Sequence, residues 1–269
     1  MTAPLAPAAP SARSAERGGA ELRLTAVEFD ACWELLGLGE RPAALSLPSP
    51  GRTHTERRRV LDAVLDGLRR RGLASDRPHP VIADLMGLLA RPRHEIDLRL
   101  SGGRSALGAI AGNLGVVVAR QGEQVWTVGL RAAEVVPRLV SFAGSMQPAV
   151  LRPVNIPADA LDEALRVAAP RRSMWAVADE LTVRGVPRAD AASLARAFTE
   201  VHDLGQLSVT GIVEGRRRPA PWCCGFHRTG TGWVATVRSA APSGTTVSVF
   251  PVDAGRLAMR LDDVLRRSL

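Results

Sequence analysis

The sequence predicts an α+β fold in which two quasi-two-fold related halves share a central antiparallel sheet flanked by helical bundles. Two pairs of β-branched or aromatic runs, each interrupted by a polar turn, have the pattern of β-hairpins. These pairs are residues 115–119 with 125–128 and residues 221–227 with 233–237. An apolar-periodic segment typical of a helix follows each pair, at 132–142 and at 253–265. The repeated order predicts similar halves at 21–150 and 151–269, because one pattern of elements occurs twice.

The first half begins with a short alternating strand at 22–24. Thr25 and Glu28 have the spacing of a capping box, so a helix is expected to start there. The other predicted elements of this half are an extended segment at 44–48, helices at 53–71 and 80–90, and a strand at 94–100. Pro92 ends the third helix, and a loop at 101–105 leads into the hairpin.

The second half is expected to repeat this layout. Its predicted elements are a strand at 154–157, a helix that begins at Pro157, helices at 174–184 and 189–201, and strands at 206–213 and 245–250. Residues 216–219, with three arginines and a proline, are interpreted as a loop.

Composition limits the class of protein. The 269 residues are 46% hydrophobic, which is enough for a sizeable core in one large domain or two small ones. Residues 1–20 are rich in Pro, Ala and Gly and are expected to form a disordered tail. The apolar runs are shorter than a membrane span needs, so a cytoplasmic protein is expected. Three cysteines, two of them adjacent, do not make a disulfide framework.

The net charge of +8 comes from arginine alone, since the sequence has no lysine. Arginines are scattered through every segment and aromatic residues make up only 4% of the chain. A protein that binds nucleic acid usually gathers its cations on one face, with aromatic residues between them. Nucleic-acid binding is therefore not expected.

No catalytic or metal-binding motif stands out, and neither a cofactor nor a metal is expected. The five histidines are dispersed, and Cys223 and Cys224 are too close together to form a Cys-x-x-Cys site. Gly108, Gly112 and Gly115 precede a strand and are expected in turns or bulges. The rival hypothesis to a binding protein is a small hydrolase or transferase that uses His202 and Asp203, or Cys223.

Several short motifs, in this order, resemble the EspG family of ESX (type VII) secretion-associated proteins of actinobacteria. They are Leu24-Thr25-x-x-Glu28, Trp33 to Gly39, Leu47-Pro48-Ser49, Glu56-Arg57-Arg58, Leu88 to Pro92, Glu95 to Arg99, and Gly232-Trp233. The resemblance implies a cytosolic, non-enzymatic chaperone with quasi-two-fold halves. Family members bind substrates of the PE–PPE kind and keep them soluble until secretion, and a smaller WXG100-like client is the alternative partner.

The resemblance also implies where a client binds: on the sheet, on a strand-connecting loop, and on the helical bundle of the second half. In this chain the loop corresponds to residues 101–113 and the bundle to about 174–202. Tryptophan at the edge of a sheet or bundle is a common interface anchor, and the bundle has more apolar residues than one buried stripe needs. The expected partner-binding residues are Arg104, Trp126, Trp175, Leu181 and Phe198.

Overall fold

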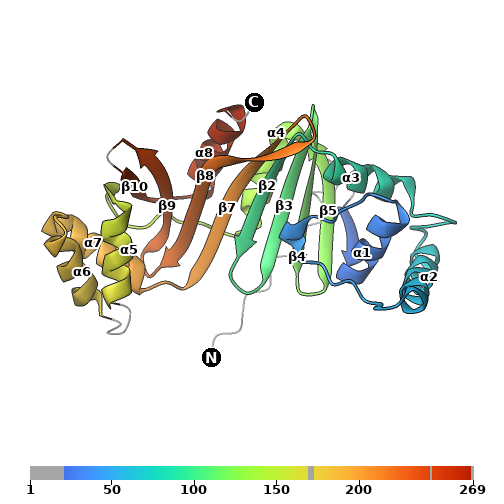
Figure 1. Cartoon of the computed structure of the whole chain (residues 1–269), viewed down its shortest axis with the longest axis horizontal. Coiled ribbons are helices and arrows are strands. Elements are labelled where there is room, and N and C mark those ends of the chain that lie inside the picture. The colour runs from blue at the N-terminus through green and yellow to red at the C-terminus, as the bar shows by residue number, and fades with distance from the viewer. Residues whose placement is uncertain (1–20, 169–172, 243, 268–269) are drawn as a thin grey trace. The chain divides into compact units, whose positions relative to one another are not determined.

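A computed structural model of the chain describes residues 21–168, 173–242 and 244–267. The tail expected at 1–20 lies outside these residues, as do Arg171 and Arg172. By its internal contacts the chain divides into two compact units, one made of residues 1–95 and 103–144 and the other of residues 96–102 and 145–269. Each unit is described separately below (Figure 1).

The first unit contains a strand, three α-helices, four strands and a final helix. In chain order they are β1 (Glu21–Thr25), α1 (Ala26–Leu35), α2 (His54–Arg70), α3 (Pro80–Ala90), β2 (His94–Leu100), β3 (Arg104–Ala111), β4 (Leu114–Gln121), β5 (Gln124–Arg131) and α4 (Ala132–Ser141), with a short 3₁₀ helix, η2 (Ala43–Leu45), after α1. β2 is divided between the units, because its first two residues belong to the first unit and the rest to the second.

The second unit repeats this order. Its elements are β6 (Val154–Pro157), α5 (Ala158–Ala168), α6 (Met174–Val183), α7 (Arg188–Thr199), β7 (Asp203–Val213), β8 (Arg216–Thr229), β9 (Gly232–Ala241), β10 (Gly244–Pro251) and α8 (Ala254–Arg267). In each half the first strand pairs antiparallel with the last, β1 with β5 and β6 with β10. The prediction of an α+β fold with two similar halves is confirmed.

The strands are hydrogen-bonded in the order β1-β5-β4-β3-β2-β7-β8-β9-β10-β6. Both predicted hairpins are present, as β4 with β5 and β8 with β9, and their pairing is antiparallel. The expected antiparallel sheet is therefore confirmed as a ten-stranded sheet.

Helix α1 starts at the capping box that the sequence predicted, and the bounds of α3 also agree with the prediction. Thr25 Oγ1 accepts a hydrogen bond from Glu28 N at 3.1 Å, and the Glu28 carboxylate accepts one from Thr25 N at 2.8 Å. Thr53 forms the same capping box at the start of α2. α3 runs from Pro80 to Ala90, as predicted, since proline is favoured in the first turn of a helix and Pro92 cannot continue it.

Each unit packs its helices on both faces of its strands. In the first unit α1 to α3 share a core with Leu107 and Val116, whereas α4 covers the opposite face. A Cβ on Gly115 would lie 2.1 Å from Val135 Cγ2, so only glycine lets α4 come this close. In the second unit α5 to α7 pack on Val247 and Val249, and α8 lies on the opposite face.

Three segments differ from the sequence-based expectation. Residues 104–111, expected in a loop, form β3, because the strongly β-forming β4 offers them a complete antiparallel partner. Residues 216–219, interpreted as a loop, are the start of β8 and pair with β7. Residues 43–45, expected to be extended, are helical, and Ser46 closes that turn with a φ of 45°.

β8 is paired unevenly on its two sides. It pairs with β7 over residues 216–219 and 223–228, with a bulge at residues 220–222, but with β9 only from Cys224 to Thr229. The first half of β8 therefore has one unpaired edge among the described residues, and Pro219 and Pro221 lie in it.

Candidate functional site: an open basin on the second unit

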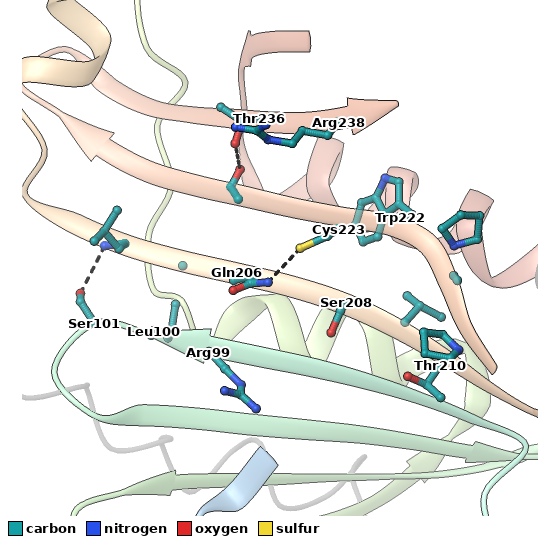
Figure 2. A pocket seen from close by; sticks show the side chains of 17 residues that line it. Arg99, Leu100, Ser101, Gln206, Ser208, Thr210, Trp222, Cys223, Thr236 and Arg238 are labelled. Carbon is teal, nitrogen blue, oxygen red and sulfur yellow. Dashed lines mark hydrogen bonds between the residues drawn. The ribbon is translucent and has the colours of Figure 1, made fainter. Parts of the chain in front are cut away.

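A hollow of about 920 Å³ lies on the strands of the second unit (Figure 2). Four strands contribute to it: β2, β7, β8 and β9. Its lining residues are Arg99, Leu100, Ser101, Leu204, Gly205, Gln206, Ser208, Val209, Thr210, Pro219, Ala220, Pro221, Trp222, Cys223, Gly225, Thr236 and Arg238. We call this hollow the basin.

The register of the strands explains how residues distant in sequence meet here. Gln206 pairs with Gly225, and Gly225 pairs with Thr236, so one row crosses three strands. Ser208 and Cys223 form the neighbouring pair on the same face, because side chains two residues apart along a strand point to the same side. Figure 2 shows Gln206 and Cys223 pointing toward one another, and Gln206 Nε2 donates a hydrogen bond to Cys223 Sγ at 2.9 Å.

The floor of the basin is built from small side chains. A Cβ on Gly225 would lie 2.8 Å from Thr236 Oγ1, and that hydroxyl donates a hydrogen bond to Gly225 O at 3.2 Å. Among the apolar lining residues, Leu204 is 56% exposed and Trp222 is partly exposed. A partner can thus approach the strands closely and contact the exposed side chain of Leu204.

The basin carries positive charge and no acidic lining residue. Arg99 is exposed and makes no ion pair among the described residues. Arg238 binds the Asp162 carboxylate of α5 with both terminal nitrogens, at 2.8 Å and 2.5 Å. This contact lowers the pKa of Asp162 and raises that of Arg238. The basin therefore favours an occupant with acidic groups at its margin.

Helix α7 is held on the face of the strands that carries the basin. His227 follows Gly225 on the same face of β8, and its Nε2 lies 2.8 Å from Ala197 O in the last turn of α7. The Phe198 ring packs on the His227 ring with 5.1 Å between centroids. Burial lowers the pKa of His227, the Ala197 hydrogen bond opposes that shift, and the net change is downward. The neutral imidazole therefore donates Nε2–H to the carbonyl and fixes α7 on the sheet.

The two alternative catalytic candidates, the His202–Asp203 couple and Cys223, lie apart from each other on the strands. Asp203 pairs with Arg228 at 2.7 Å, whereas Cys223 pairs with Ser208, five residues further along β7. Five strand residues span about 17 Å, and an odd separation places the two side chains on opposite faces. Burial raises the pKa of Cys224 to about 12, so this thiol is protonated and unreactive. Within the described residues no three metal-ligating side chains cluster.

The residues expected to bind a partner are distributed over both units. Arg104 and Trp126 lie on the same face of the first unit, two strands apart, and both are partly exposed. In the second unit Trp175 is 70% exposed on α6, Phe198 is partly exposed on α7, and Leu181 is fully buried. Val177 and Leu194 are also buried, so most of the apolar excess of the bundle is core.

Sequence reasoning missed the basin itself. Its charged residues Arg99 and Arg238 lie on strands that come together only through the register. Leu204 is an exposed leucine in an otherwise ordinary alternating strand, and no local pattern marks it as different from a core position.

No helix of the described residues is long and apolar enough to cross a membrane.

Comparison with known proteins identifies the family. The model of the EspG family matches residues 25–263. The backbone is similar to that of the Mycobacterium tuberculosis type VII secretion system chaperone EspG5, solved in complex with the PE25–PPE41 dimer. The TM-score is 0.74 at 16% identity, over 91% of this chain and 96% of that one. HtdX of M. tuberculosis aligns over 86% of this chain and 97% of that one at 12% identity, with a TM-score of 0.13. No curated protein sequence matches. Because the family model spans nearly the whole chain, this protein belongs to the EspG family.

Proposed function

We propose that this protein is a cytosolic, non-enzymatic chaperone that binds a PE–PPE-type substrate of a type VII secretion system and keeps it soluble for export. The observation that carries the proposal is the match of the EspG family model to residues 25–263. The similarity of the backbone to EspG5, which was solved with a PE–PPE dimer bound, supports it.

The basin is the proposed binding site of the client. Elsewhere the helices α5 to α7 cover this face of the second unit, and the basin is the part that they leave open. A helical tip with apolar side chains would bury Leu204 and its own surface together, at about 25 cal/mol per Å² of apolar area removed from water. Acidic residues beside the tip would meet Arg99.

Trp175 on α6 is exposed and is a further proposed contact, although it does not line the basin. Aromatic side chains at an interface contribute much of the binding energy when a partner covers them. Leu181 is left out of the proposed surface, because it is fully buried in the core of the second unit. Arg104 and Trp126 remain proposed contacts of the first unit.

A substitution in the basin tests the proposal. Leu204→Asp places a charge where the client is expected to bury apolar surface, and should weaken client binding at least tenfold, equivalent to about 1.4 kcal/mol. Val150→Asp is the matched control, because Val150 is 88% exposed and does not line the basin. Binding is measured by co-purification and calorimetry with a PE–PPE dimer from the source organism. Equal affinity of both variants would move the client away from the basin.

Cys223 provides a second, independent readout. It is the exposed cysteine, whereas Cys32 and Cys224 are buried and burial raises the pKa of each to about 12. Iodoacetamide should therefore label Cys223 first, and a bound client should slow that labelling. If a saturating client leaves the labelling rate unchanged, the client does not cover the basin.

A further inference from the structure

Helix α3 in the first unit is apolar on nearly all sides but is not buried. It carries a single charged residue, Asp84, among eleven positions. Ile82, Met86 and Leu89 are buried, yet Val81 is 45% exposed and Leu85 and Leu88 are only partly covered. A helix that is apolar all round normally lies inside a protein or beneath a partner.

A leucine from the sheet borders the same side of the unit. Leu114, the first residue of β4, is 64% exposed. Its side chain lies on the same face of the sheet as those of Val116 and Val118, because alternate residues of a strand share a face. Those two valines share a core with Leu89 of α3. We call Val81, Leu85, Leu88 and Leu114 the α3 surface.

Two arginines lie at the C-terminal end of the α3 surface, and one carboxylate, that of Asp84, is exposed on α3 beside Val81 and Leu85. Arg91 and Arg93 follow α3 directly, are exposed, and make no ion pair among the described residues. Arg131 lies opposite Leu114 on β5 and pairs only with Glu134 at 2.8 Å. A second copy of this chain, with its net charge of +8, would bring like charge to this surface. Arg91 and Arg93 thus favour a different partner, whose carboxylates lie at the C-terminal end of α3 and away from Asp84.

We infer that the α3 surface binds an amphipathic helix with acidic flanks, presented by a protein other than the client. The apolar stripe of such a helix would cover the four residues of the α3 surface, and its flanking carboxylates would meet Arg91 and Arg93. Every residue of this surface belongs to the first unit, whereas the basin belongs to the second. The chain would then connect a client to another protein. That the basin holds a client rests on the proposed function, whereas binding at the α3 surface does not.

The test uses the full chain and two synthetic helical peptides. Both carry leucine at positions i, i+4 and i+7; one has glutamate flanks and the other lysine flanks. Fluorescence anisotropy should show the glutamate peptide binding at least tenfold more tightly, with affinity falling as salt rises. Leu114→Glu and the double variant Arg91→Glu, Arg93→Glu should each reduce its binding at least tenfold. Val150→Glu is the control for an exposed residue outside the surface.

Three results would overturn the inference. The first is equal affinity for both peptides, and the second is unchanged peptide affinity in Leu114→Glu. The third is a concentration-dependent dimer of the wild-type chain in sedimentation experiments that is absent in Leu114→Glu, because a second copy of the chain would then be the occupant. Client binding is measured in parallel. Leu114→Glu should leave it unchanged, whereas Leu204→Asp should leave peptide binding unchanged, so that failure of one proposal is distinguishable from failure of the other.

Discussion

Replacing Gly205 with alanine should destabilise the protein, although alanine is the better residue in most strands. Gly205 on β7 pairs with Phe226 on β8. A Cβ at Gly205 would lie 2.1 Å from Phe226 Cζ and 2.3 Å from Cε2. The ring is 1% exposed and packs on Trp233 with 5.7 Å between centroids, so it has little room to move away.

The magnitude follows from two opposing effects. Overpacking a core costs about 1–3 kcal/mol. The smaller conformational entropy of alanine in the unfolded chain offsets about 0.5–1 kcal/mol of this. The free energy of unfolding should therefore fall by about 1.3 kcal/mol in Gly205→Ala when the middle of each range is taken, and by at most about 2.5 kcal/mol. Urea denaturation followed by tryptophan fluorescence measures it, since Trp233 touches the perturbed ring.

Two comparisons isolate the steric cause. In a Phe226→Leu background the ring is absent, and Gly205→Ala should be neutral or stabilising. A Cβ at Gly87, in the interior of α3, would have no atom within 4 Å, so Gly87→Ala should stabilise by up to about 1 kcal/mol. A Gly205→Ala variant as stable as the wild type would refute the argument that Phe226 excludes a side chain there.

Three further perturbations have calculable outcomes. Thr25→Ala removes the cap of α1 and should cost about 1 kcal/mol in urea denaturation, with Thr25→Ser retaining most of it. Asp30→Asn removes the fully buried carboxylate that pairs with Arg41 and, at 2.8 Å, with Arg57, and should cost about 3 kcal/mol, the low end for a broken buried pair, because Arg57 keeps Glu34 as a partner. His227 has a lowered pKa in the folded chain, so the unfolded chain binds the proton first and stability should fall as pH drops below about 6.5. His227→Gln should lose less stability than the wild type between about pH 7.5 and pH 5.

Each of these has an outcome that contradicts it. An unchanged urea midpoint in Thr25→Ala would mean that the cap contributes nothing. An Asp30→Asn variant of wild-type stability would mean that the buried ion pair is replaceable by a neutral amide. Parallel pH profiles for wild type and His227→Gln would show that another group controls the acid side.

The sequence predicted elements whose signals are local. The boundaries of α3 follow from Pro80 and Pro92, and the start of α1 follows from the capping box at Thr25. β3 was missed because its Ala- and Gly-rich stretch has weak strand propensity, and only pairing with β4 makes it extended. The start of β8 was missed because three arginines and a proline resemble a loop, although an exposed strand tolerates both.

The candidate site was less accessible to sequence reasoning. The sequence alone does not show whether an apolar residue on a helix is buried in the core or exposed to solvent. Leu181 is buried and Trp175 is exposed, and this difference arises from how the helices pack. The basin depends on register between strands that are more than a hundred residues apart in the chain, such as those of Arg99 and Leu204. Long-range pairing of this kind has no signature in a single sequence.

The two prolines of β8 bear on how this chain avoids aggregation. An exposed strand edge is a template on which another chain can add a strand by hydrogen bonding to its free amides. Pro219 pairs with Thr210, and Pro221 lies in the bulge between Pro219 and Cys223. Neither proline has an amide hydrogen, so this stretch of β8 has two donors fewer to offer. A strand that docked there would find fewer amide donors and would meet two pyrrolidine rings, which disfavours growth of the sheet at this edge.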